Sequence, residues 1–304
     1  MENAERHRDR AVGALLGLAV GDAVGASREF TRRDAVPPLG DMEGGGHFAL
    51  QAGQWTDDTA MALCLADSIL ACRKLDQHDL LQRFCRWWRR GENSSTGVGF
   101  SIGITTYAAL ERYERTGDPV AGNDDPSRAS NGSLMRLAPV AIYWHRERSA
   151  AEAMARQQSV TTHGAAAAVE ACAFFVHVLL DAIEGLPRER VLRTREWPAH
   201  DDVAAIACGA WRKKPRANIH SSGYVIHTLE AALWSVARSA NFRDAVLTAA
   251  NLGDDADTVA AVAGQLAGSL YGASGIPAKW IERLAWNERI GALGASLYGE
   301  GRRR

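Results

Sequence analysis

Apolar and polar residues alternate along the chain with the period of an α-helix rather than that of a β-strand. Alanine is abundant in these periodic segments, and the β-branched alternation typical of strands is scarce. The pattern predicts an all-α protein in which clear strands are missing. The predicted helices are residues 11–26, 56–74, 78–90, 162–183, 223–239, 242–251 and 257–272.

The first predicted helix carries a stripe of glycines. Gly13, Gly17, Gly21 and Gly25 follow one another at intervals of four residues. At about 3.6 residues per turn they lie on one face of the helix. Glycine lowers helix stability, so a stripe of four indicates that another backbone packs closely against this face.

The segments between the predicted helices include three that are rich in glycine and polar residues. They are residues 28–54, 89–100 and 116–135. None has the composition of a long flexible linker. The simplest organisation is one all-α domain over residues 1–304, with the functional loops gathered at one end.

Composition and charge exclude several classes of protein. The chain has 304 residues, of which 46% are hydrophobic and 23% are charged, so it can bury a large core. Its formal net charge of -1 provides no field for nucleic acid or a membrane surface. Five cysteines without C-x-x-C spacing favour reduced thiols and a cytoplasmic protein. We find no signal peptide and no uninterrupted apolar stretch of about 18 residues, so no membrane span is expected.

The motif "WTDDTAM", Trp55–Met61, places two adjacent carboxylates at the start of a helix. Thr56 suits the N-cap position, and Asp57 and Asp58 then fall in the first turn. Acidic residues there stabilise the positive end of the helix dipole. Stabilisation of the helix N-terminus is therefore sufficient to explain a single acidic helix start.

A second acidic start, "GDDADTVAAV", repeats this layout near the other end of the chain. Asp254, Asp255 and Asp257 precede Thr258, and three acids in four residues repel one another unless a cation lies among them. Carboxylate and hydroxyl oxygens suit Mg²⁺, Mn²⁺ or Ca²⁺, and no Cys or His stands at zinc-ligand spacing. If the two helix starts converge, they can hold two divalent ions bridged by carboxylates. Convergence itself is not visible in the sequence.

Five motifs resemble those of the ADP-ribosylglycohydrolase family. Relatives in this family include the dinitrogen reductase-activating glycohydrolase and the ADP-ribosylarginine and ADP-ribosylserine hydrolases. The motifs occur in the family's order and cover about residues 11–298. The resemblance implies a single-domain orthogonal helical bundle with a dinuclear Mg²⁺ or Mn²⁺ site in a cleft. The motifs are "GALLGLAVGDAVGASREF", "GQWTDDTAMALCLADSIL", "NGSLMRLAPVA", "THG" and "NLGDDADTVAAVAGQLAGSLYG".

The resemblance also implies a ligand set drawn from both acidic starts. Asp254 stands where many relatives have the second glycine of Gly-Gly-Asp, so it is expected to lie outside this set or on the surface. The expected metal ligands are Thr56, Asp57, Asp58, Asp255, Asp257 and Thr258.

Further positions match the substrate site of the family. Glu29 matches an acidic residue on a mobile loop near the reacting ribose, and with this match a role in the site is favoured over a solvated loop acid. The glycine-rich segment 94–101 suits a phosphate cradle. His163 in "THG" matches a family histidine near the substrate, with a capping or satisfied buried histidine as the alternative. Tyr224 is an expected contact of adenine or ribose, and a core aromatic is nearly as good an interpretation. The expected substrate contacts are Gly97, Gly99, Ser101, Asn131, Gly132, Ser133, Met135, His163 and Tyr224.

The resemblance implies cleavage of the bond between the anomeric carbon of ADP-ribose and a modified side chain. Glycosidic cleavage usually needs two carboxylate functions, and Glu29, Asp57 and Asp58 are the best-placed candidates. Arginine is the expected linkage, with serine or a small ADP-ribose derivative as alternatives. An ADP-ribosyltransferase or toxin is a possible functional counterpart of such an enzyme.

Two other classes remain as competitors. "GFSIG", Gly99–Gly103, matches the G-x-S-x-G nucleophile elbow, which would make Ser101 a hydrolase nucleophile. The elbow requires a preceding strand, and the residues before it are polar and loop-like. A protein that only binds ADP-ribose should have lost metal ligands, whereas all six matched positions are present.

Overall fold

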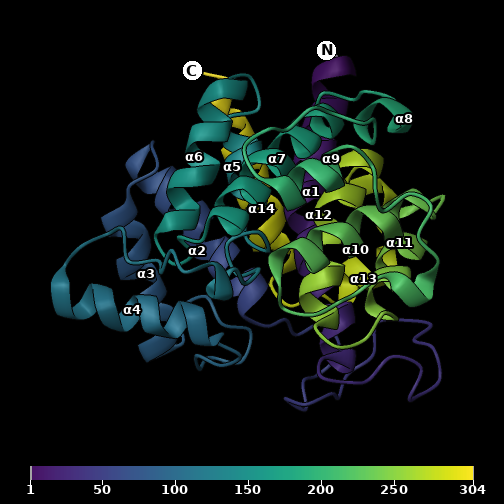
Figure 1. Ribbon diagram of the computed structural model, residues 1–304, viewed down its shortest axis with the longest axis horizontal. Helices are drawn as coiled ribbons and strands as arrows, with labels where there is room; N and C mark the ends of the chain where they lie inside the picture. The colour runs from purple at the N-terminus through teal and green to yellow at the C-terminus, as the bar shows by residue number, and fades with distance from the viewer. Residues whose placement is uncertain (1, 304) are drawn as a thin grey trace.

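This computed structural model describes residues 2–303, in which helices are joined by loops (Figure 1). Within this range there is no strand, and extended segments meet only at isolated bridges. The all-α prediction is confirmed. The helices are α1 (Glu2–Gly25), α2 (Asp57–Cys72), α3 (Gln77–Arg90), α4 (Ile104–Thr116), α5 (Ala138–Tyr143), α6 (Arg148–Val160), α7 (Ala166–Ile183), α8 (Arg188–Val191), α9 (Asp201–Ala207), α10 (Val225–Ala237), α11 (Phe242–Ala250), α12 (Ala256–Tyr271), α13 (Ala278–Arg283) and α14 (Asn287–Gly301), and the 3₁₀ turns are η1 (Ala26–Arg28), η2 (Pro126–Arg128), η3 (Arg216–Asn218) and η4 (Ala273–Gly275).

Several helix boundaries differ from the predicted ones. Helix α1 begins at Glu2 rather than at residue 11, because the charged start of the chain continues the helix. Helix α7 begins at Ala166, since the amides of Thr162 and His163 bond back to the Ser159 carbonyl and close a turn first. The short helices α5, α8, α9 and α13 were not predicted, and neither were the longer helices α4, α6 and α14. Their apolar stripes are interrupted by polar residues or, in α14, by glycines.

Helices α1 and α12 form the most extensive helix pair among the described residues, and they cross the middle of the molecule (Figure 1). The glycine stripe of α1 faces α12. A Cβ on Gly17 would lie 2.2 Å from the Gly264 carbonyl oxygen, and a Cβ on Gly21 would lie 2.1 Å from that of Ala260. Only glycine permits this approach, so the predicted backbone contact is confirmed. It brings the end of α1 beside the start of α12.

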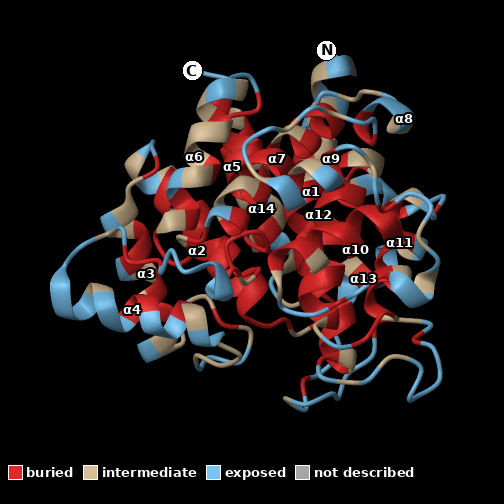
Figure 2. Cartoon of the chain, viewed as in Figure 1, coloured by how far each residue is buried: buried red, intermediate tan, exposed pale blue. Residues whose placement is uncertain are grey.

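A single continuous core holds the helices together. The buried apolar residues of this core run from Ala11 to Tyr298, and Figure 2 shows that buried residues are found in most helices. Two segments, Asn3–Arg28 and Ala166–Ile183, are long and apolar enough to cross a membrane by length and composition. However, 89% and 78% of their apolar windows are buried inside the protein, as is typical of core helices.

Candidate functional site

The two acidic helix starts meet in space. The Thr56 hydroxyl lies 3.1 Å from a carboxylate oxygen of Asp257, although 201 positions separate the two residues. On the other side, the Thr258 hydroxyl lies 3.3 Å from an oxygen of Asp58. The starts of α2 and α12 therefore face each other and form one acidic cluster.

Asp22, which sequence reasoning missed, connects these starts to α1. Each of its carboxylate oxygens accepts two hydrogen bonds. Oδ1 accepts from the amide and hydroxyl of Thr56, both at 2.9 Å, and Oδ2 accepts from the amide of Thr59 at 2.9 Å and from its hydroxyl at 2.6 Å. Thr56 occupies the N-cap position of α2, but its own side chain makes no capping bond. The fully buried Asp22 supplies the cap from another helix.

The cluster contains buried carboxylate oxygens that lack partners. Asp22, Asp58 and Asp257 each offer an oxygen within 4.8 Å of the others. Glu29 Oε2, Asp58 Oδ1 and Asp257 Oδ1 are buried and accept no hydrogen bond. An unsatisfied buried polar group costs about 1–3 kcal/mol, and more when it is charged. The arrangement therefore fits a hard cation, which carboxylate and hydroxyl oxygens prefer to bind.

The electrostatics of the cluster support this interpretation. Burial, followed by the charges of neighbouring carboxylates, raises the pKa values of Asp57, Asp58 and Asp257 well above their usual range. Burial, followed by the charge of Asp255, raises the pKa of Glu29 to about 8. A divalent cation would favour the ionised forms and reverse these shifts.

Asp255 and Asp254 have different environments. Asp255 accepts a 2.6 Å hydrogen bond from the Asn131 side chain and belongs to the cluster. Asp254 is exposed and has a φ of 56°, in the left-handed region that favours glycine. Its backbone pairs with the Glu29 loop, through bonds of 2.7 Å to Phe30 and 2.8 Å to Thr31. Asp254 thus lies outside the cluster, on the surface.

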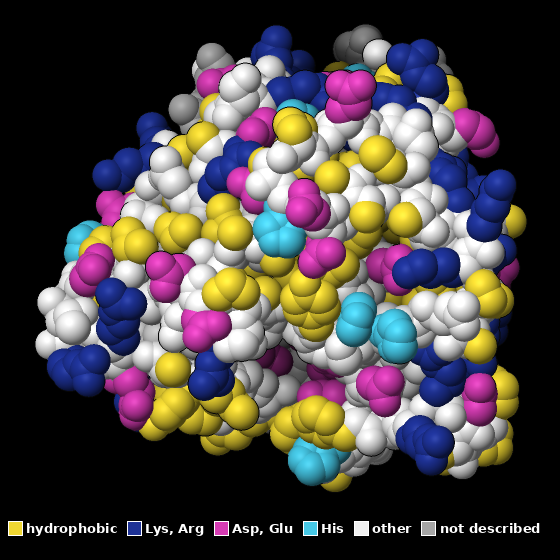
Figure 3. Space-filling model, in the orientation of Figure 1, with side chains coloured by type: hydrophobic (Ala, Val, Ile, Leu, Met, Phe, Trp, Pro, Cys, Tyr) yellow, Lys and Arg dark blue, Asp and Glu magenta, His cyan; other side chains and the backbone are white. Residues whose placement is uncertain are grey.

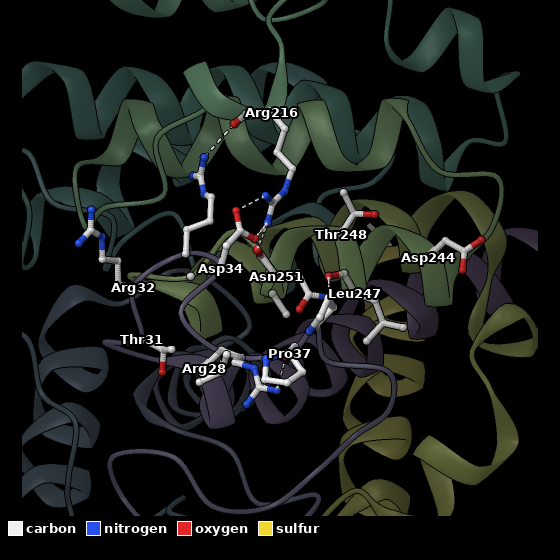
Figure 4. A pocket seen from close by; sticks show the side chains of 15 residues that line it. Arg28, Thr31, Arg32, Asp34, Pro37, Arg216, Asp244, Leu247, Thr248 and Asn251 are labelled. Atoms are coloured by element: carbon white, nitrogen blue, oxygen red, sulfur yellow. Dashed lines mark hydrogen bonds and ion pairs between the residues drawn. The ribbon is translucent and has the colours of Figure 1, made fainter.

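The loop that carries Glu29 is fixed to the second acidic start. Glu29 itself is 6% exposed, so it is not a solvated loop acid. The guanidinium of Arg33 donates to the carbonyls of Leu252 and Arg216, each at 2.8 Å. Beside these contacts lies a cavity of about 500 Å³, where Arg216 pairs with Asp34 at 2.7 Å (Figure 4). Arg33 and Arg216 thus hold the loop in place.

The glycine-rich loop approaches the cluster through Ser101. The Ser101 side chain lies close enough to Glu29 and Asp57 to lower the pKa values of both. Gly99 is required by packing, because its Cβ would lie 2.4 Å from the Trp88 carbonyl oxygen. Gly97 has a φ of 79° and open space around it. No strand precedes Ser101 among the described residues, so the nucleophile elbow is absent.

The loop before α5 turns two of its expected contact residues toward the site and two away from it. Asn131 reaches Asp255, and a Cβ on Gly132 would lie 2.7 Å from the His163 ring. The side chain of Ser133 is fully buried and accepts a 2.8 Å hydrogen bond from Ser159. Met135 is 2% exposed and belongs to the core. These last two side chains support the loop from the interior.

His163 and Tyr224 flank the same loop. Both ring nitrogens of His163 have partners, Ser130 at 2.9 Å and Thr162 at 2.8 Å. Burial lowers the pKa of His163 to about 3, so the ring is neutral. Tyr224 is half-buried, and its hydroxyl donates to Asp202 at 3.0 Å. Figure 3 shows a hollow on this face with acidic side chains at its floor and hydrophobic and histidine side chains around it.

Comparisons with known proteins agree with this architecture. The chain is 49% identical to ADP-ribosylarginine hydrolase Tri1 of Pseudomonas putida (strain GB-1), over 97% of this chain and 79% of that protein. It is 33% identical to the ADP-ribosyl-[dinitrogen reductase] glycohydrolase of Rhodospirillum rubrum, over 91% of this chain and 90% of that protein. A solved structure described as an ADP-ribosylglycohydrolase-related protein complex has 40% identity, and it superposes with a TM-score of 0.88 over 98% of this chain and 99% of the other.

The sequence model described as ADP-ribosylglycohydrolase matches residues 3–304, nearly the whole chain. The resemblance carried by the five motifs, the all-helical fold and the converging acidic starts point to the same conclusion. This chain belongs to the ADP-ribosylglycohydrolase family.

Proposed function

We propose that this protein is a metal-dependent hydrolase that removes ADP-ribose from modified arginine side chains. The observation that carries the proposal is the cluster of buried carboxylates with unpartnered oxygens at the meeting point of α2 and α12. The arginine linkage is supported by relatives of 49% and 46% identity that are named ADP-ribosylarginine hydrolases, from Pseudomonas putida and Serratia proteamaculans.

Two divalent cations, Mg²⁺ or Mn²⁺, are proposed as the cofactors. Such ions would orient ribose hydroxyls and lower the pKa of a water molecule at the site. Thr258 and Asp255 contribute from the start of α12, and Asp22 holds the start of α2 in position because both of its oxygens accept hydrogen bonds from Thr56 and Thr59. The proposed ligands are Thr56, Asp57, Asp58, Asp255, Asp257 and Thr258.

The protein's own acids can move the protons that the reaction requires. Water adds to the anomeric carbon, the bond from this carbon to the guanidine nitrogen breaks, and the nitrogen gains a proton. Glu29 is buried with an unpartnered carboxylate oxygen, and like Asp57 it lies beside the Ser101 side chain. We assign these two acids to proton transfer, and Asp58 to the floor of the cluster.

Recognition of the rest of the substrate is assigned to the loops around the cluster. Asn131, which bonds to Asp255, and the adjacent Gly132 are proposed to contact ADP-ribose directly, and the buried His163 is proposed to support them from behind. The glycine-rich loop with Gly97 is proposed to lie against the phosphates. An arginine-directed ADP-ribosyltransferase or toxin would supply the substrate, and a cytoplasmic location remains a prediction.

Release of free ADP-ribose from matched arginine-linked and serine-linked peptides tests the proposal. Each peptide is incubated with Mg²⁺, with Mn²⁺ and with EDTA. Release from the arginine peptide that EDTA abolishes is the expected result. Release from the serine peptide alone would overturn the linkage, and release that persists in EDTA would overturn the metal dependence.

Substitutions inside and outside the acidic cluster test whether the activity depends on it. Asp58→Asn and Asp257→Asn each remove a charge inside the cluster and are expected to abolish release. Asp254→Asn is the matched control, because this neighbouring acid is exposed and asparagine tolerates its left-handed backbone. Equal losses in all three variants would show that the buried cluster has no special role.

A further inference from the structure

A buried guanidinium lies behind the substrate loop. Arg136 is fully buried, and its hydrogen-bond partners are all neutral groups. It donates to the Gln158 side chain at 2.8 Å, to the Thr161 hydroxyl at 3.2 Å and to the Thr162 hydroxyl at 2.9 Å. Its guanidinium also lies 4.6 Å from the centre of the Phe84 ring. A guanidinium has donors and no acceptor, so it sets the direction of every hydrogen bond it makes.

This direction determines the tautomer of His163. The Thr162 hydroxyl accepts from Arg136, and it lies 2.8 Å from His163 Nδ1. If Nδ1 carried the proton, the Thr162 hydrogen would have no acceptor among the described residues. A buried hydroxyl left unsatisfied costs about 1–3 kcal/mol. Thr162 therefore donates to Nδ1, and the proton of the neutral ring is on Nε2.

The tautomer of His163 in turn fixes the direction of its hydrogen bond to Ser130. Nε2 of His163 lies 2.9 Å from the Ser130 hydroxyl oxygen, so the ring donates and Ser130 accepts. The Ser130 hydroxyl then retains its own hydrogen, for which the described residues offer no acceptor. Ser130 is half-buried and directly precedes Asn131, which bonds to Asp255 in the acidic cluster. The hydroxyl hydrogen of Ser130 can thus be donated to a ligand beside the acidic cluster.

We propose that Arg136, Thr162 and His163 form a relay that commits the hydroxyl of Ser130 to donate a hydrogen bond to a phosphate oxygen of ADP-ribose. The part of this inference that concerns ADP-ribose rests on the proposed function. A chain of hydrogen bonds that begins at a cation polarises each member toward an anionic acceptor at its end. Ser130 is the binding residue, and the other three are positioning residues.

The tautomer of His163 is the direct test of the relay. Long-range ¹H–¹⁵N correlation spectra of the folded protein distinguish a ring protonated on Nε2 from one protonated on Nδ1. We expect the Nε2–H form in the parent and in Thr161→Val, and a changed pattern in Thr162→Val. Thr161 is the matched control, because it accepts from Arg136 but donates to the Gln158 carbonyl at 2.7 Å instead of to His163. An Nδ1–H ring in the parent would overturn the relay.

Affinity for ADP-ribose tests the role of Ser130. Calorimetric titration of Ser130→Ala should give a Kd about 10–100-fold higher than the parent, as expected for one lost hydrogen bond to a charged oxygen. Thr162→Val should weaken binding in the same direction, and Thr161→Val should not. A parent-like Kd for Ser130→Ala would overturn the assignment. A parent protein that binds no ADP-ribose would instead overturn the proposed function and, with it, the contact from Ser130 to a phosphate. The tautomer of His163 would still decide whether the relay exists.

Discussion

Substitution of Gly21 by alanine probes the contact on which the site is built. A Cβ at this position would lie 2.1 Å from the Ala260 carbonyl oxygen, 2.6 Å from its carbon and 2.9 Å from the Ala261 Cα. All three are backbone atoms of α12, so no side-chain rotamer can relieve the clash. To reach an ordinary contact of 3.4 Å, the two helices must separate by about 1.3 Å.

The magnitude follows from two opposing contributions. Overpacking costs about 1–3 kcal/mol, and a clash with rigid backbone belongs at the upper end of this range. Alanine is favoured over glycine in a helix by about 1 kcal/mol, which offsets part of the loss. The expected net loss in the free energy of unfolding is therefore about 2 kcal/mol. Because α1 carries Asp22 and α12 carries Asp257, the separation should also weaken metal binding.

Equilibrium urea denaturation measures this loss, provided that the denaturant slopes agree between variants. Gly299→Ala is the matched control, since this helical glycine of α14 has nothing within 4 Å of its missing Cβ. The control should be unchanged or stabilised by up to about 1 kcal/mol. If Gly21→Ala behaves like Gly299→Ala, the close approach of α1 and α12 is not required for stability, and the reasoning fails.

Three further predictions concern the site. Asp22→Asn should lower the free energy of unfolding by at least about 2 kcal/mol in urea denaturation, because an amide NH₂ would face the donors of Thr56 or Thr59. Mg²⁺ or Mn²⁺ should raise the thermal unfolding midpoint of the parent but not that of Asp58→Asn, with about 2.7 kcal/mol gained at a hundredfold excess over Kd; an equal rise in both would contradict the site. The pKa of His163 is lowered to about 3 in the folded protein, whereas its ordinary value is 6.5. Between these two pH values the unfolded chain binds a proton on His163 and the folded protein does not. The contribution of His163 to stability should be complete above pH 6.5 and decline as the pH falls toward 3, and His163→Gln should flatten this part of the pH profile.

The acidic cluster was partly visible in the sequence. Both helix starts were identified, because Asp57 and Asp257 stand in short motifs beside threonines. Asp22 was missed, since nothing local distinguishes an acid inside an apolar helix from one that points to solvent. Its position between Gly21 and Gly25 of the stripe was the available indication. The stripe shows that this face meets another backbone, and an acid next to it is therefore buried.

The substrate loop shows the same limit at the level of single side chains. The motif "NGSLMR" was identified as a unit, but it does not show which side chains face the site. Gly132 faces His163, whereas Ser133 and Met135 point into the interior. The direction of a loop side chain depends on what packs behind it. Arg136, whose guanidinium donates to neutral groups on Gln158 and Thr162, provides that support here.

The sequence by itself determined the helical class, the glycine face of α1 and the two acidic helix starts. Each is a local pattern, set by the helical period, by the absence of a side chain or by the preference of acids for a helix N-terminus. Tertiary structure alone decided that the starts meet, that Asp22 caps α2 from another helix and that Asp254 stays outside the cluster. These depend on contacts such as the one from Thr56 to Asp257, whose partners lie 201 positions apart and become neighbours only when α2 and α12 both pack against α1.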